Sequence, residues 1–399
     1  MFFINEDFKT QPVKRKLIFT LIILVLLLPL WMWLAWLLTP KKKMVMAIVD
    51  KTEVNASGQE HVSLNWVLNH ERFTKTSAEP YAVSRDYFGF FPLQNEAFRL
   101  KGLERFSPQQ LDQLSADCSV AYFTDTYGVF SNEWYTKKNV AERSGIVYGG
   151  MSRQDIQFLA KMKEKHKLII TEFNSIGSPT APEIREQFEN MFGMKWSGWI
   201  GRYFETFDTA LNRELPRWLI NNYLAQNNHQ WPFTKPGVAF VSDKDEVVIL
   251  EEGTHLEDPL PHIITTPSAR DEYDLPSRIK YSFWFDVVAA DTTVNTIAAE
   301  FLLQPNRAGA TLLMNHGIPA SFPAVLQHKG TDYQFYYFCA DFCDNPVPML
   351  ASYFKGIPFF RFLFFDESDA MERKSFFWKY YRPLLTKILK EHYKVADGK

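Results

Sequence analysis

Polar residues that could carry out chemistry follow four apolar runs of this sequence, each as long as a buried strand. The runs span residues 44–49, 119–124, 145–148 and 167–173. The polar and glycine residues at their ends are Asp50, Lys51, Asp125, Thr126, Tyr127, Gly149, Gly150, Glu172, Asn174 and Ser175. Ligands of an open parallel sheet bind outside the carboxyl ends of its strands, so these residues form the predicted site.

Three of these residues are carboxylates, namely Asp50, Asp125 and Glu172. Two carboxyl groups about 5 to 10 Å apart can act as the acid and the base of glycoside hydrolysis. The same groups could instead bind ligand hydroxyls, or cap helices, because acidic and amide side chains favour strand-to-helix turns. We therefore name the three as catalytic candidates and keep both alternatives open.

The other residues at these strand ends are candidates for ligand binding. The Gly149-Gly150 turn could hold an anion, although a tight turn explains it equally well. Ser175 lies in half of a nucleophile elbow, but the position that requires glycine is Phe173, which argues against a nucleophilic serine. Arg202 follows two tryptophans, and such a group could stack on a sugar or pack in the core.

The elements that must position this site follow from hydrophobic periodicity. A helix over 152–165, capped by Ser152, precedes the strand at 167–173, and a capping box at Thr180–Glu183 opens a helix that stops at Gly193. Strands and helices in alternation predict an α/β fold with an open, mostly parallel sheet and helices on both faces, of the flavodoxin-like type. Residues 237–250 and 322–338 read as two hairpins.

The residues from Leu17 to Leu38 are a run of 22 uncharged, mostly apolar residues. A helix of roughly 20 apolar residues crosses a bilayer, so residues 17–38 are predicted to form one transmembrane helix after a tail at 1–16. The run is long for a signal peptide and lacks a small-residue cleavage site. Four cations in the short tail favour a cytoplasmic N-terminus and an extracytoplasmic domain, although the lysines at 41–43 argue the other way.

Composition excludes several classes of function. The 44 basic and 46 acidic residues nearly cancel, so no nucleic-acid partner is expected. Three cysteines make no disulfide framework, and the scattered histidines lack metal-ligand spacing, so we expect neither a metal nor another cofactor.

The α/β domain is assigned to 44–350, and an aromatic and basic helical tail to 351–399. We expect the helical part of this tail, residues 371–393, to pack on the domain rather than to lie in a membrane interface, because Pro383 interrupts its amphipathic face.

Three segments carry a resemblance to a known family: Gly149–Ser152, Glu186–Gly193 and Tyr333–Asp344. On these, the chain resembles the class I glutamine amidotransferase-like superfamily, in particular its extracytoplasmic members. It is also similar to uncharacterised bacterial membrane-anchored proteins associated with polysaccharide production. The resemblance does not extend to the catalytic triad of that superfamily, since Asn174-Ser175 stands where its nucleophilic cysteine would be.

The resemblance therefore implies a fold and a binding or assembly role, without release of ammonia from glutamine. We expect a single-pass anchored component of cell-envelope or exopolysaccharide biosynthesis, with polysaccharide or envelope-assembly proteins as partners. One alternative is a carbohydrate hydrolase that uses the carboxylate pair. Another is a purely structural interaction protein at the membrane.

Overall fold

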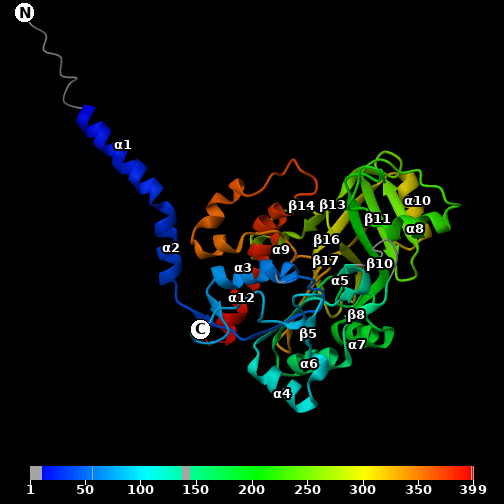
Figure 1. The fold of residues 1–399 in the computed structure, drawn as a ribbon, viewed down its shortest axis with the longest axis horizontal. Coiled ribbons are helices and arrows are strands. Elements are labelled where there is room, and N and C mark those ends of the chain that lie inside the picture. Colours follow the sequence, from blue (N-terminus) through cyan, green and yellow to red (C-terminus); the bar gives the residue numbers. More distant parts are fainter. Residues whose placement is uncertain (1–10, 56, 137–143, 397, 399) are drawn as a thin grey trace, which may run out of the picture.

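Two helices lead into the folded domain of this computed structural model, which describes residues 11–55, 57–136, 144–396 and 398. They are α1 (Gln11–Leu26), which projects away from the domain, and α2 (Leu28–Leu38), which runs beside it (Figure 1). No single helix of the described chain has the length and apolar content to cross a membrane, but the pair Ile18–Leu26 and Leu28–Leu38, bent by 48°, meets both conditions together.

The predicted single helix over 17–38 is therefore two helices. Pro29 lies in the first turn of α2 and has no backbone N–H to continue the hydrogen-bond ladder of α1, which accounts for the bend. Of the predicted tail, residues 1–10 lie outside the described residues, and 11–16 belong to α1.

The main sheet has ten strands in the order β14-β13-β16-β17-β18-β9-β6-β2-β4-β5. In chain order these are β2 (Met46–Asp50), β4 (Phe88–Pro92), β5 (Phe98–Lys101), β6 (Val120–Asp125), β9 (Leu168–Glu172), β13 (Leu256–Thr265), β14 (Arg278–Lys280), β16 (Thr296–Pro305), β17 (Ser321–Lys329) and β18 (Gln334–Phe338). Only the pairs among β18, β9, β6, β2 and β4 are parallel. The other pairs are antiparallel.

The sheet is thus mixed, and the prediction of a mostly parallel sheet holds only for its centre. The strands β2, β6 and β9 are buried along their whole length and join through crossovers, as parallel strands do. Among the later strands, a short hairpin joins β17 to β18, whereas residues 266–277 link β13 to β14 and residues 306–320 link β16 to β17; these pairs form an antiparallel wing. The predicted third buried strand is a further correction: β8 (Ile146–Tyr148) is half-exposed and pairs only with β7 (Val129–Phe130), outside the main sheet.

Helices cover the parallel centre of the sheet. They include α3 (Val62–His70), α4 (Pro108–Asp117), α6 (Arg153–Glu164) and α7 (Pro182–Phe192). Ser152 caps α6 as predicted, and Gly193 ends α7 with a φ of +63°, which glycine adopts without strain. The predicted capping box at Thr180 does not form, because the Thr180 hydroxyl instead accepts a hydrogen bond from the Met151 amide.

A second, antiparallel sheet has the order β12-β11-β10-β15. Its strands are β10 (Met194–Phe204), β11 (Gly237–Ser242), β12 (Val247–Glu251) and β15 (Phe285–Ala290), and α8 (Arg217–Gln226) packs against it. The predicted hairpins are β11 with β12 and β17 with β18, and both are confirmed. The remaining elements are β1 (Lys42–Lys43), β3 (Phe73–Thr74), α5 (Ser131–Trp134), α9 (Pro267–Tyr273), α10 (Arg307–Asn315), and 3-10 helices at Gln59–His61, Leu103–Arg105, Met349–Tyr353 and Ile357–Leu363.

The helical part of the aromatic tail packs into the main hydrophobic core, as expected. It forms α11 (Lys374–Phe376), a π-helical turn at Phe377–Tyr381 and α12 (Arg382–Ala396). The ring of Trp378 meets that of Trp66 on α3 edge to face, and both residues are fully buried. Pro383, the second residue of α12, does not break the helical run, which continues from the π-helical turn directly before it.

Candidate functional site

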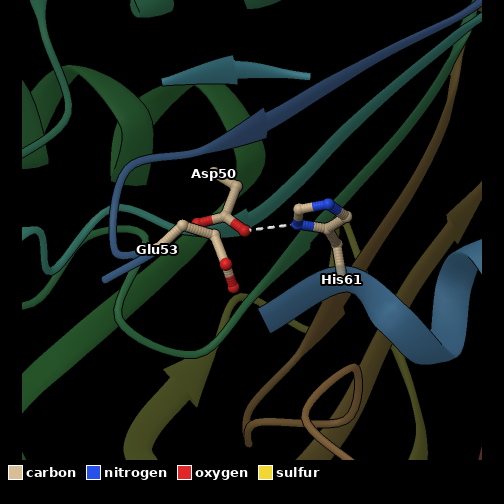
Figure 2. A group of neighbouring side chains, drawn as sticks. All are labelled: Asp50, Glu53 and His61. Atoms are coloured by element: carbon tan, nitrogen blue, oxygen red, sulfur yellow. Dashed lines mark hydrogen bonds and ion pairs between the residues drawn. The ribbon is translucent and has the colours of Figure 1, made fainter. Parts of the chain in front are cut away.

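Asp50, at the end of β2, is bound to a histidine that comes eleven residues later. Figure 2 shows the Asp50 carboxylate directed at the ring of His61, at the start of α3, with the Glu53 side chain beside them. The His61 Nδ1 lies 2.5 Å from Asp50 Oδ2, and its Nε2 lies 2.8 Å from the carbonyl oxygen of Val83. Burial works to lower the pKa of His61, but the hydrogen bond and charge of Asp50 outweigh it and raise that pKa.

This arrangement is an interior ion pair rather than a catalytic dyad. A carbonyl oxygen only accepts hydrogen bonds, so His61 Nε2 carries a proton and offers no lone pair to a metal or a nucleophile. The Glu53 carboxylate accepts hydrogen bonds from the amides of Gly58 and Glu60. The three side chains are close enough to share an ion, but their donors and acceptors are used within the protein.

Asp125, at the end of β6, is joined to Asp50 through one threonine. The Thr52 amide donates to Asp50 Oδ1, and the Thr52 hydroxyl donates to Asp125 Oδ1 over 2.8 Å. The Tyr127 amide also donates to Asp125 Oδ1. Burial raises the pKa of Asp125 to about 7, since these hydrogen bonds offset the loss of hydration only in part. The structure therefore brings two of the three predicted carboxylates together.

Three further carboxylates, Glu60, Asp341 and Asp344, gather beside this pair, with ligand oxygens within 4.8 Å of one another. Asp344 accepts hydrogen bonds from Arg373 at 2.9 Å and from Gln59 at 3.1 Å. Burial, together with the charges of the neighbouring carboxylates, raises the pKa values of Glu60 and Asp341 well above the ordinary range. Both carboxyl groups therefore hold their protons to a higher pH than exposed carboxyl groups do.

Glu172, the third predicted carboxylate, does not join this group. It is fully buried at the end of β9, and its Oε2 accepts hydrogen bonds from the amides of Phe342 and Cys343, both 2.9 Å long. The Tyr122 hydroxyl donates to its other oxygen. Burial raises the pKa of Glu172 to about 8. Its contacts are those of a group that ties β18 and the following loop to β9.

Lys51 is also committed to the interior. Its ammonium group is fully buried and contacts Glu104, Asp155 at 2.6 Å and the carbonyl of Gly150 at 3.0 Å. Burial works to lower the pKa of Lys51, but the two carboxylates outweigh it and raise that pKa. Lys51, which was predicted to bind a ligand, is therefore instead the centre of a buried cluster of ion pairs.

The backbone around Thr126 and the glycine turn is closely packed. Thr126 donates its hydroxyl hydrogen bond to the carbonyls of Asn174 and Ser175, and both Thr126 and Ser175 are fully buried. A Cβ on Gly149 would lie 2.6 Å from Gly128 Cα, so only glycine allows this approach. The Gly149-Gly150 segment is thus a tight turn whose Gly150 carbonyl binds Lys51.

A cavity of about 460 Å³ opens next to this edge, and two of the predicted residues, Tyr127 and Asn174, line it. Ligand pockets usually span roughly 300–1,000 Å³. Three further aromatic rings line the cavity, namely Phe130, Trp196 and Trp218. Its polar lining consists of amide, hydroxyl and carboxylate side chains: Asn132, Ser144, Ser178, Ser242, Glu133, Asp243 and Asp245. No lysine or arginine belongs to the lining among the described residues.

Arg202 lies on β10 and does not line this cavity. It is mostly buried and ion-pairs with Glu214, while its guanidinium carbon lies 5.0 Å from the centre of the Phe283 ring. Of the two predicted stacking tryptophans, Trp196 lines the cavity and donates its indole hydrogen bond to the Trp199 carbonyl. Trp199 itself packs in the core. Trp196 belongs to the same core, so core packing holds for both rings, and stacking of Trp196 on a sugar stays a prediction.

Several residues of the site escaped the sequence reasoning. Asp341 and Asp344 follow β18, so the rule that found Asp50 and Asp125 would have found them had the run at 332–338 been placed in the parallel centre. His61 and Glu60 stand at the start of a predicted helix and carried no sequence signal. Trp218 comes from α8, on the second sheet, and only the packing of the two sheets brings it to the cavity.

The buried carboxylates predict how stability depends on pH. Burial raises the pKa values of Glu53 and Asp125 to about 7, so between about pH 4 and pH 7 the folded state holds protons that the unfolded state releases. Their stabilisation is complete below the unfolded pKa values and is lost as pH rises to about 7. We expect calorimetry to show that replacing Asp125 with asparagine, which mimics the protonated group, flattens the fall in Tm from about pH 5 to pH 8.

Comparing the pH dependence of Tm in the wild type and in the Asp125→Asn variant isolates the contribution of Asp125. His70 and His392, whose pKa values burial lowers to about 4, act in the opposite sense below about pH 6.5, but in both proteins alike. An Asp125→Asn variant whose Tm follows pH as the wild type does would contradict the assignment.

Comparison with known proteins gives similarity in structure only. No protein family model matches the chain, and no curated protein matches its sequence. A ThuA-like protein from Parabacteroides merdae is similar at 9% identity and a TM-score of 0.34, over 75% of this chain and 79% of that one. ThuA-like proteins have a glutamine amidotransferase-like fold.

Two larger enzymes are similar over a part of their length. A β-galactosidase from Bacillus circulans sp. alkalophilus matches at 11% identity and a TM-score of 0.31, over 79% of this chain and 31% of the enzyme. The carbohydrate deacetylase Agd3 matches at 8% identity and a TM-score of 0.31, over 75% of this chain and 29% of the enzyme.

Proposed function

We propose that this chain is a membrane-anchored carbohydrate-binding protein, which uses α1 and α2 as its anchor and the aromatic cavity as its binding site. The cavity lies at the carboxyl ends of the parallel strands, where ligands of α/β proteins bind. Its four rings offer flat apolar faces, and its amides, hydroxyls and carboxylates offer partners for hydroxyl groups. This lining is the observation that carries the proposal.

The charge of the cavity narrows the class of ligand. Glu133, Asp243 and Asp245 give it an acidic lining, and the described lining residues include no cation. Arg185 lies beside the cavity but is engaged, since it ion-pairs with Asp243 at 3.7 Å and packs over the Trp196 ring. Such a lining disfavours phosphorylated or acidic sugars and favours neutral sugars or sugars that carry amino groups.

Binding accounts for the site better than hydrolysis does. Asp50 and Glu172 are fully buried, Asp125 is almost so, and the oxygens of all three accept hydrogen bonds from groups of the protein. None of the three belongs to the lining of the cavity. We therefore propose a binding or assembly role in the production of cell-envelope polysaccharide, with the domain outside the cytoplasm.

The test is sugar binding by the full chain in lipid nanodiscs. Calorimetric titration would use tetrasaccharides of N-acetylglucosamine, of glucosamine and of glucose, each separately. We expect at least one to bind, and we expect Trp218→Ala to raise its Kd roughly tenfold or more, because a central aromatic side chain commonly contributes more than 1 kcal/mol.

Trp231→Ala is the matched control. Trp231 packs in the same aromatic cluster as Trp218 and is likewise half-buried, but it does not line the cavity. It should therefore reduce stability without changing Kd. The absence of binding to all three sugars, or an equal effect of the two variants, would refute the proposal.

A further inference from the structure

A second apolar surface of this protein lies beside its N-terminal helices. It consists of the two 3-10 helices Met349–Tyr353 and Ile357–Leu363, and we call it the 349–363 surface. Four of its large apolar side chains are 65–85% exposed, namely Leu350, Phe359, Phe362 and Leu363. Exposed apolar residues concentrated in one short segment mark an interaction surface rather than ordinary scatter.

Direct contacts set this surface against α2. The Lys355 amide donates a 3.0 Å hydrogen bond to the Met32 carbonyl, and the ring centres of Tyr353 and Trp36 lie 4.8 Å apart. Figure 1 shows the orange segment that contains the surface next to α2, on the side of the domain from which α1 projects. The surface is therefore placed relative to the anchor by the fold itself.

These contacts also indicate how deep the 349–363 surface would lie in the membrane that α2 enters. Met32 precedes Leu38, the last residue of α2, by six positions, which is about 9 Å along a helix. Interfacial segments lie about 5–10 Å into the boundary between headgroups and acyl chains. The exposed indoles of Trp31 and Trp33 lie at the same level of α2, where tryptophan favours the membrane interface.

Positively charged side chains flank the 349–363 surface, as is typical of segments that lie in a membrane interface. Arg361 is exposed between Phe359 and Phe362, so its guanidinium can reach the headgroups while the rings turn inward. The exposed Lys41 and Lys43 follow the end of α2 on the same side. These cations suit anionic lipid headgroups.

We propose that the 349–363 surface inserts into the outer part of the same bilayer that α1 and α2 enter, as a second, monotopic membrane contact. The proposal rests on the proposed anchor. Continuity with the apolar surface of α2 and the matching depth argue for lipid as the occupant. The domain would then be held by two contacts, so that its cavity keeps a constant orientation to the membrane.

The experiment measures depth with nitroxide labels on the full chain in nanodiscs of phosphatidylglycerol and phosphatidylethanolamine. The native cysteines are buried, so single cysteines at Phe359, Leu24 and Leu211 can be labelled one at a time. Leu24 reports on the anchor, and Leu211 is an exposed apolar residue of the domain outside the surface. Collisions with oxygen and with a water-soluble nickel chelate report lipid and water, respectively.

We expect the label at Phe359 to collide with oxygen several times more often than with the chelate, as at Leu24, and the label at Leu211 to show the reverse. A chelate-accessible label at Phe359 with a lipid-exposed Leu24 would overturn this inference and leave the anchor intact. Chelate access at both would overturn the anchor as well. A label at Phe359 shielded from both reagents would show that protein, such as a second copy, covers the surface instead of lipid.

Discussion

Replacing Lys51 with methionine is expected to lower the free energy of unfolding by about 3 to 5 kcal/mol, as removal of one partner of a buried ion pair does. The fully buried ammonium neutralises Glu104 and Asp155, and without it the Asp155 carboxylate stays buried with no opposite charge. Chemical denaturation followed by circular dichroism would measure the loss.

Lys387→Met is the control for this variant. Lys387 makes an exposed ion pair with Glu391 at 3.3 Å, and such pairs contribute only about 0.3–0.5 kcal/mol. A double variant, Lys51→Met with Asp155→Leu, should recover part of the loss, since it also removes the uncompensated charge. If Lys51→Met were as stable as the control and instead impaired sugar binding, Lys51 would be a ligand-binding residue, as its position after β2 had suggested.

Replacing Glu172 with alanine is expected to cost on the order of 3 kcal/mol of stability or more. The substitution leaves the buried amides of Phe342 and Cys343 and the Tyr122 hydroxyl without their acceptor, and each unsatisfied group costs about 1–3 kcal/mol. Thermal unfolding of the wild type and the variant would report the difference as a lower Tm.

Glu172→Gln separates a structural role from a catalytic one. Because the pKa of Glu172 is raised to about 8, the carboxyl group is largely neutral at pH 7, and glutamine retains its shape and one acceptor oxygen. We expect this variant to keep most of the stability that alanine loses. Equal losses in the two variants would show that the charge of Glu172 matters, which would contradict a neutral, structural carboxyl group at this position.

Local patterns in the sequence were enough to predict the elements at the centre of the fold. The buried runs at β2, β6 and β9 have the continuous hydrophobicity of parallel strands, and Ser152 and Gly193 carry the cap preferences of α6 and α7. The strand-end rule also placed Asp50 beside Asp125, and Tyr127 beside Asn174, because the ends of neighbouring parallel strands share one edge.

Local sequence patterns could not predict which strands pair with one another when they lie far apart in the chain. A strand such as β18 has the same composition whether it ends a hairpin or joins a parallel strand, and in this fold it does both, with β17 on one side and β9 on the other. The antiparallel wing and the position of Asp341 and Asp344 follow from that choice. The sequence likewise marked an apolar stretch at 17–38, but only the structure shows its bend and its contact with the 349–363 surface.

Sequence alone thus determined which residues reach the edge of the sheet, since strand length and the alternation of elements are local properties. Tertiary structure decided what each residue does there. The side chains of Lys51 and Glu172 turn into the interior and contact partners from distant segments, whereas Tyr127 and Asn174 line a cavity that Trp218 of α8, the helix packed on the second sheet, completes. Whether a polar side chain meets solvent or a buried partner depends on contacts between segments far apart in the chain, and no local pattern encodes them.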